Sequence, residues 1–155
     1  MGRVRAELVA LTFALLLLGA APAQAASLSL ARSGQVRVGT PVTLTVMVDT
    51  TGQPVNAIQA NLSFPVGRLA CGSLAVELTT WPVVAEQTCV GGLVKVAVGS
   101  FTPRVGRRAV AKVSLMPLSR GSANVRFAPG SAVVESVTNT RVLRSARAAS
   151  FTVRP

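Results

Sequence analysis

The sequence contains no histidine and no tyrosine, and only 4% of its 155 residues are aromatic. Histidine is the side chain best suited to acid–base catalysis near neutral pH and is a common metal ligand. The two cysteines are too few for a Cys₄ zinc site, and the lack of histidine excludes a Cys₂His₂ site. These absences disfavour a metalloenzyme, a Ser-His-Asp hydrolase and a cysteine protease. We expect no cofactor and no metal ion.

Acidic residues are also scarce, since five Asp and Glu stand against 16 Lys and Arg, a formal net charge of +11. Four carboxylates follow the first 25 residues: Asp49, Glu77, Glu86 and Glu135. A glycosidase needs two carboxylates that face one bond at about 5–9.5 Å, and no motif here indicates such a pair. We predict that the protein is not an enzyme and that Asp49 serves a turn.

The basic excess includes two groups of arginines, one around a predicted turn and one near the C-terminus: Arg104, Arg107 and Arg108, and Arg141, Arg144 and Arg147. One interpretation is an attraction to an anionic cell-surface polymer; the other is a set of solvated side chains. Aromatic and basic residues are not interleaved, so we expect no specific nucleic-acid partner.

Residues 1–25 are typical of a secretory signal peptide. Arg3 and Arg5 precede an apolar run from Leu8 to Ala21, and Ala23-Gln24-Ala25 supplies a cleavage pattern. The apolar run is shorter than the roughly 20 residues that cross a membrane, although a retained anchor is the alternative. We predict cleavage before Ala26, which removes Arg3, Arg5 and Glu7 and leaves an extracellular protein of net charge +10 that is not transmembrane.

Cys71 and Cys89 lie in the part of the chain that we expect to be exported. An oxidising compartment favours a disulfide between them, and two buried free thiols are the alternative. A catalytic thiol is disfavoured because there is no histidine to activate it.

Apolar and polar residues alternate with a period of two along most of the remaining chain, which is typical of half-buried strands. The alternation predicts strands over residues 42–49, 57–64, 94–99, 110–116, 123–127, 132–135 and 150–153. Glycine and proline turns separate these runs, and no stretch has the period of an amphipathic helix. Spacings of about 8–12 residues favour an all-β sandwich of about nine strands that fills residues 26–155 as one domain.

The order of these segments resembles that of cohesin modules. In that family a Val-Gly turn leads into an alternating strand, and a second strand ends in an aromatic residue, a proline and then a leucine. The segments that carry the resemblance are Gly34–Gly39, Val42–Asp49, Gly52–Ala57, Gln59–Pro65 with Leu69, Val94–Ser100, Ala109–Leu115, Gly121–Phe127, Gly130–Val134 and Phe151–Val153. The resemblance covers nearly all of residues 26–155.

This resemblance implies a nine-stranded jelly-roll sandwich, similar in fold to family 2 and family 3 carbohydrate-binding modules. Cohesins are non-catalytic and bind a dockerin, which itself carries the calcium. Dockerin-binding cohesins present an Asn and an Asp two residues apart, where this chain has Ala57 and Gln59. The resemblance therefore directs attention to the outward residues of this strand and of the strand beside it: Gln59, Asn61 and Ser63, with Lys95 and Ala97.

Two other functions remain open. A carbohydrate-binding module for an extracellular polysaccharide would use Trp81 as a stacking platform together with Gln59, Asn61 and Ser63, unless Trp81 lies in the core. A structural subunit of an envelope or filament would instead accept a neighbour's strand at an exposed sheet edge.

Overall fold

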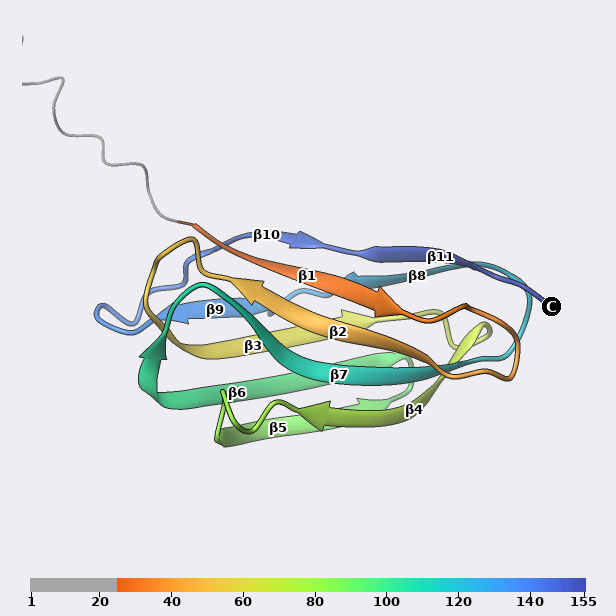
Figure 1. Cartoon of the computed structure of the whole chain (residues 1–155), viewed down its shortest axis with the longest axis horizontal. Coiled ribbons are helices and arrows are strands. Elements are labelled where there is room, and N and C mark those ends of the chain that lie inside the picture. Colours follow the sequence, from red (N-terminus) through yellow and green to blue (C-terminus); the bar gives the residue numbers. More distant parts are fainter. Residues whose placement is uncertain (1–24) are drawn as a thin grey trace, which may run out of the picture.

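The structure is a computed structural model that describes residues 25–155, in which eleven strands form two sheets packed face to face (Figure 1). One sheet has five strands in the order β10-β1-β2-β7-β4. The other has six, in the order β11-β8-β3-β6-β5 with β9 also paired to β3. The strands are β1 (Ala26–Ser33), β2 (Val42–Asp49), β3 (Val55–Ser63), β4 (Leu69–Val76), β5 (Val83–Val90), β6 (Leu93–Arg104), β7 (Arg107–Pro117), β8 (Gly121–Phe127), β9 (Ala132–Glu135), β10 (Leu143–Arg147) and β11 (Ala149–Val153).

The all-β sandwich expected from the alternation is confirmed, with eleven strands in residues 25–155 where about nine were expected. The sequence pattern located no strand at β1, β4, β5 or β10. β4, β5 and β10 are edge strands of their sheets, with a weak or interrupted alternation between buried and exposed residues. An edge strand has a partner on one side only, so its sequence carries less of the pattern that reveals a strand.

The core lies between the inner faces of the two sheets. Along β2 every second residue, from Val42 to Val48, is fully buried, and the inward residues of β3 are also buried. β-Branched and leucine side chains fit this pleated interior, and each buried side chain contributes roughly 1.5–3 kcal/mol. The intervening residues of both strands therefore face outward, which places Gln59 on the outside.

The two long edges of the sandwich are closed in different ways. At one edge β10 and β11 are separated only by Ala148, and this continuous segment passes from the five-stranded sheet to the six-stranded one (Figure 1). At the other edge the disulfide Cys71–Cys89 joins β4 to β5, with 6.1 Å between the two Cα atoms. Gln87 Nε2 adds a hydrogen bond to the carbonyl oxygen of Leu74 at 2.7 Å across the same edge. The predicted disulfide is thus present.

The signal peptide predicted for residues 1–25 falls outside the described residues except for Ala25, whose carbonyl oxygen accepts a hydrogen bond from Thr51 Oγ1 at 2.8 Å. Within residues 25–155 no helix is long and apolar enough to cross a membrane.

We predict that replacing both cysteines (Cys71→Ala with Cys89→Ala) lowers the free energy of unfolding by about 3 kcal/mol, because the disulfide restricts the unfolded chain. Urea unfolding followed by tryptophan fluorescence measures the difference. A reducing agent should destabilise the natural protein and leave the double variant unchanged. Equal unfolding midpoints for the disulfide-bonded natural protein and the double variant, measured without a reducing agent, would contradict a stabilising disulfide.

Candidate functional site

Five of the six candidate binding residues lie together on the outer face of the six-stranded sheet. Across the antiparallel pair of β3 and β6, Gln59 is opposite Ala97, and Asn61 is opposite Lys95. Ser63 lies at the end of the same row, opposite Leu93. Directly opposed residues on one face have Cβ atoms about 4.5–5.5 Å apart, so these side chains share one surface.

One half of this face is hollowed into a shallow apolar groove of about 320 Å³. We call it the outer-sheet groove, and its outward lining residues are Ala57, Gln59, Val83, Ala85, Ala97, Gly99, Ala132, Val134 and Arg141. The hollow arises because alanine and glycine occupy the central positions of β3 and β6, whereas longer side chains stand at its margins. A surface of this kind accepts apolar side chains of a partner.

Arg141 lies at the margin of the groove, and Phe101 lies on β6 just beyond the lining residue Gly99. Arg141 pairs with Val134 in an antiparallel bridge, which places its side chain on the same face as Val134 and supplies a positive charge to the groove. Phe101 follows Gly99 by two residues on β6, and its side chain is 86% exposed. The sequence placed Arg141 only in a candidate anion-attracting group with two other arginines near the C-terminus and assigned no function to Phe101, because the position of Arg141 beside the groove and the exposure of Phe101 depend on tertiary structure.

Asn61 has a structural function in this sheet. β3 pairs with β9 up to Gln59 and with β8 from Leu62 onward, and Asn61 lies at this change of partner. Asn61 Nδ2 donates to the carbonyl oxygen of Pro129 at 3.1 Å, and its backbone N–H donates to Ser131 Oγ at 3.1 Å. A Cβ at Gly130 would lie 2.8 Å from Asn61 Nδ2, so the turn requires glycine there. Asn61 therefore anchors the β8–β9 turn, and one of the two N–H groups of its side-chain amide is already used.

Trp81 corrects one sequence-based interpretation. Its side chain is fully buried in the β4–β5 connection, and its Nε1 donates to the carbonyl oxygen of Ala109 at 2.9 Å. A buried indole with a satisfied N–H has no free face for a sugar ring. Trp81 is thus a core residue that closes one end of the sandwich, and its assignment as a ligand platform is wrong.

The carboxylates occupy separate places. Asp49 Oδ1 accepts a hydrogen bond from the Thr51 backbone N–H at 3.0 Å, which is the turn function predicted for it. Glu86 lies 3.8 Å from Lys95 Nζ on the outer sheet face, in an exposed ion pair. Within residues 25–155, no three His, Cys, Asp or Glu side chains gather in a way that would hold a metal ion.

Glu135 holds the loop that carries Arg141. It is buried at the end of β9, where Thr138 Oγ1 donates to its Oε2 at 2.6 Å and the backbone N–H of Thr138 donates to the same atom at 2.7 Å. The backbone N–H of Val137 donates to Oε1 at 2.8 Å. These hydrogen bonds, the Thr138 hydroxyl first, lower the pKa of Glu135 because they favour the ionised carboxylate, and burial opposes the shift.

Comparison with known proteins identifies the fold. The structure is similar to the CaCohA2 cohesin of Clostridium acetobutylicum, with a TM-score of 0.70 and 14% identity over 84% of this chain and 91% of that one. A non-cellulosomal cohesin of Archaeoglobus fulgidus matches with a TM-score of 0.68 and 16% identity, covering 84% of this chain and 92% of the other. The third ScaB cohesin of R. flavefaciens, solved in complex with a group 1 dockerin, matches with a TM-score of 0.68 and 15% identity over 88% and 99% of the two chains.

The chain therefore has the cohesin fold, which confirms the resemblance drawn from the order of its segments. No protein family model matches the sequence, and no curated protein matches it. At identities this low the likeness establishes the architecture alone.

We predict that Glu135→Gln destabilises the protein at neutral pH and that the difference disappears in acid. A carboxylate whose pKa is lowered on folding stabilises the folded state above its ordinary value of 4.5, and this contribution is lost as the pH falls through the lowered value. Thermal unfolding of both proteins between pH 7 and pH 2 tests this.

Glu86→Gln is the matched control for this measurement. It removes the same charge from an exposed ion pair, which contributes at most about 1 kcal/mol. A Glu135→Gln variant that retains the same stability deficit at every pH would show that the hydrogen-bonded charge is not the cause.

Proposed function

We propose that the protein is a non-catalytic binding module that holds a protein partner, dockerin-like in its mode of attachment, on the outer-sheet groove. The observation that carries the proposal is the apolar hollow between β3 and β6, and the same strand β6 carries, two residues after Gly99, a phenylalanine that is 86% exposed. Burying a phenylalanine side chain at an interface is worth roughly 1.5–3 kcal/mol. A single exposed phenylalanine is common on protein surfaces, and it is the contiguous apolar lining of the groove that is typical of a binding surface.

The chemistry of the groove indicates what kind of partner fits it. Ala57 and Ala97 offer no charge, Arg141 adds a positive charge at the margin, and Lys95 on the same face is paired with Glu86. An amphipathic helix would place apolar residues in such a groove and an acidic residue toward Arg141. Gln59, half-buried beside Ala97, is the polar group available to fix the register.

The solved structures with this fold support a protein as the partner. Cohesins of R. flavefaciens and Acetivibrio cellulolyticus were solved in complex with dockerins. This chain has Ala57 and Gln59 where the family's dockerin-binding members have Asn and Asp, so attachment here rests on apolar contact rather than on a carboxylate.

An extracellular location is part of the proposal. The Cys71–Cys89 disulfide supports it, because disulfides persist in oxidising compartments. A partner is therefore to be sought among exported or envelope proteins.

The experiment compares two variants that add the same charge to opposite faces of the sandwich. Ala97→Arg fills the outer-sheet groove, whereas Thr43→Arg modifies an outward position on β2 in the five-stranded sheet. The immobilised natural protein and the Thr43→Arg variant should retain the same exported protein, and Ala97→Arg should weaken its binding at least about tenfold. Equal retention by all three would contradict binding at the groove.

Carbohydrate binding remains a second candidate, now through Phe101, because aromatic side chains stack on sugar rings and this one is exposed. Affinity electrophoresis in gels that contain a neutral polysaccharide distinguishes the two functions. For a protein-binding module we predict that Phe101→Ala weakens retention of the protein partner about tenfold. In the polysaccharide gel, the Phe101→Ala variant should then migrate as far as the natural protein. If the polysaccharide retards the natural protein but not the Phe101→Ala variant, the result would favour carbohydrate binding.

A further inference from the structure

A second hollow, away from the outer-sheet groove, lies where the C-terminal strand changes sheets. β10 pairs with β1 only over Ala26–Ser29, after which β11 joins β8 in the other sheet. The rest of β1, from Leu30 to Ser33, has no strand on that side. The two sheets therefore part at this edge and leave a cleft of about 370 Å³.

The segment after β1 closes one end of this cleft. Gly34 has a positive φ of 85°, a conformation that glycine adopts without strain, and the chain then crosses toward β11. The backbone N–H of Arg154 donates to the carbonyl oxygen of Val36 at 2.9 Å, and the N–H of Val38 donates to that of Arg154 at 3.0 Å. These bonds fix Arg154 opposite the end of β1, where Arg32 lies.

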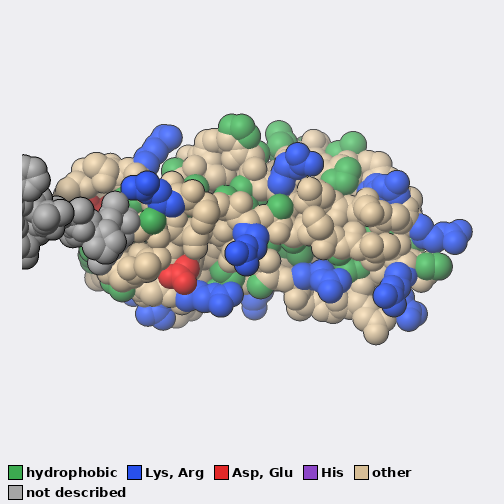
Figure 2. Space-filling model, turned by 90° about the horizontal axis from the view of Figure 1, so that it is seen from above, with side chains coloured by type: hydrophobic (Ala, Val, Ile, Leu, Met, Phe, Trp, Pro, Cys, Tyr) green, Lys and Arg blue, Asp and Glu red, His purple; other side chains and the backbone are tan. Residues whose placement is uncertain are grey.

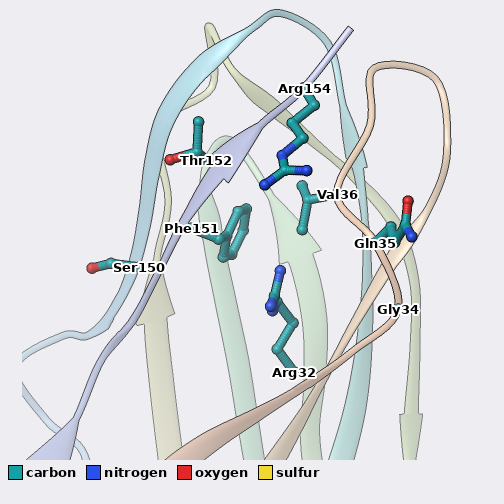
Figure 3. A pocket seen from close by; sticks show the side chains of 8 residues that line it. All are labelled: Arg32, Gly34, Gln35, Val36, Ser150, Phe151, Thr152 and Arg154. Carbon is teal, nitrogen blue, oxygen red and sulfur yellow. The ribbon is translucent and has the colours of Figure 1, made fainter.

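Two guanidinium groups converge in the cleft. Figure 3 shows the side chains of Arg32 and Arg154 pointing toward one another, with Phe151 and Val36 on either side between them. Ser150 and Thr152 point away. Arg32 is exposed and lies in the same row of β1 as Leu28 and Leu30, so the pleat directs it to the open side of the gap between the sheets.

No acidic side chain balances these two charges. Among residues 25–155 neither guanidinium has an ion-pair partner, and the single ion pair is that of Lys95 with Glu86 on another surface. Figure 2, which views the edge with β1, β10 and β11, shows many basic side chains and few acidic ones. Two like charges directed at one space repel each other unless an anion lies between them.

We propose that this two-arginine cleft, formed by Arg32, Val36, Phe151 and Arg154, binds an acidic sugar unit. The planar guanidinium donates two parallel hydrogen bonds to a carboxylate or a phosphate, and two guanidinium groups enclose such an oxyanion from both sides. The cleft, about 370 Å³, far exceeds the roughly 30 Å³ of one water, so it holds more than a bare oxyanion. A sugar ring fits the remainder, over a floor formed by the largely buried side chains of Phe151 and Val36.

The site is separate from the outer-sheet groove, so it gives the module a second ligand. Carboxylate and phosphate sugars share the chemistry that the cleft recognises, and they differ in the polymer from which they come: a uronate polysaccharide or a phosphate-linked one. The net charge of +10 expected after cleavage before Ala26 assists the approach of either polymer.

The test is an NMR titration of the purified protein with glucuronate, glucose 6-phosphate, glucose and inorganic phosphate. Glucuronate or glucose 6-phosphate should shift the amide signals of residues 32–36 and 151–154, and the tighter of the two identifies the source. Glucose should shift none of these signals. No shift with either acidic sugar would overturn the proposal, as would inorganic phosphate binding as tightly as the acidic sugars, which would indicate an adventitious ion only.

Variants separate this site from general charge. Arg32→Ala and Arg154→Ala should each weaken binding of the acidic sugar at least about tenfold. Arg144→Ala, an exposed position on β10, removes the same charge outside the cleft and should change binding less than about twofold. Equal losses in all three variants would contradict a specific site.

Thermal unfolding checks that the variants are folded. The unfolding midpoint of Arg32→Ala should not be lower than that of the natural protein, because the substitution removes a repulsion between like charges. Arg32→Lys keeps the charge but loses the planar pair of donors, so it should bind nearly as weakly as Arg32→Ala. Ala97→Arg should leave sugar binding unchanged, so a failure of the protein-binding proposal remains distinct from a failure of this one.

Discussion

The contact between the inward rows of the two sheets is the interaction on which the rest of the molecule depends. Residues such as Val46 and Leu62 are fully buried there, and the pleat then fixes every neighbouring residue to the outside. A slip of one residue in β3 would turn Gln59 inward and expose Leu62, at the cost of the core. The outer face is therefore as firmly specified as the interior, although its residues contribute little to stability.

Closure of the two edges determines where binding surfaces arise. The disulfide and the Gln87–Leu74 hydrogen bond hold β4 and β5 together, which keeps the far side of the outer-sheet groove in place. At the opposite edge the chain itself passes between the sheets, and this passage leaves the end of β1 uncovered. One edge thus supports the outer-sheet groove, and the other opens into the two-arginine cleft.

The fold was largely predictable from the sequence, whereas the site was predictable only in part. The strands with a clean alternation, such as β2 and β3, were located because each of their faces has one character. The outward positions Gln59 and Ala97 followed from the same periodicity, and the structure places them side by side. Periodicity assigned these residues to one face, and the resemblance to cohesin modules indicated that this face is the candidate binding surface.

Features that depend on contacts between distant segments were not predictable. Trp81 is buried because its loop meets the carbonyl oxygen of Ala109, and nothing in the neighbouring sequence reveals that acceptor. Arg32 and Arg154 come from opposite ends of the described chain and line one cleft only because β11 changes sheets. Arg141 reaches the groove through a loop that the buried Glu135 holds. A single sequence therefore shows which residues share a face of a strand, but it does not show which distant residues a loop contacts.

The central claim is that the outer face of the six-stranded sheet is the surface that binds a partner. Determining the structure of the protein together with the partner it retains tests this most directly. The account predicts apolar side chains of the partner seated against Ala57, Ala97 and Gly99, with Phe101 buried at the contact. A partner bound instead to the five-stranded sheet, with the groove open to solvent, would contradict it.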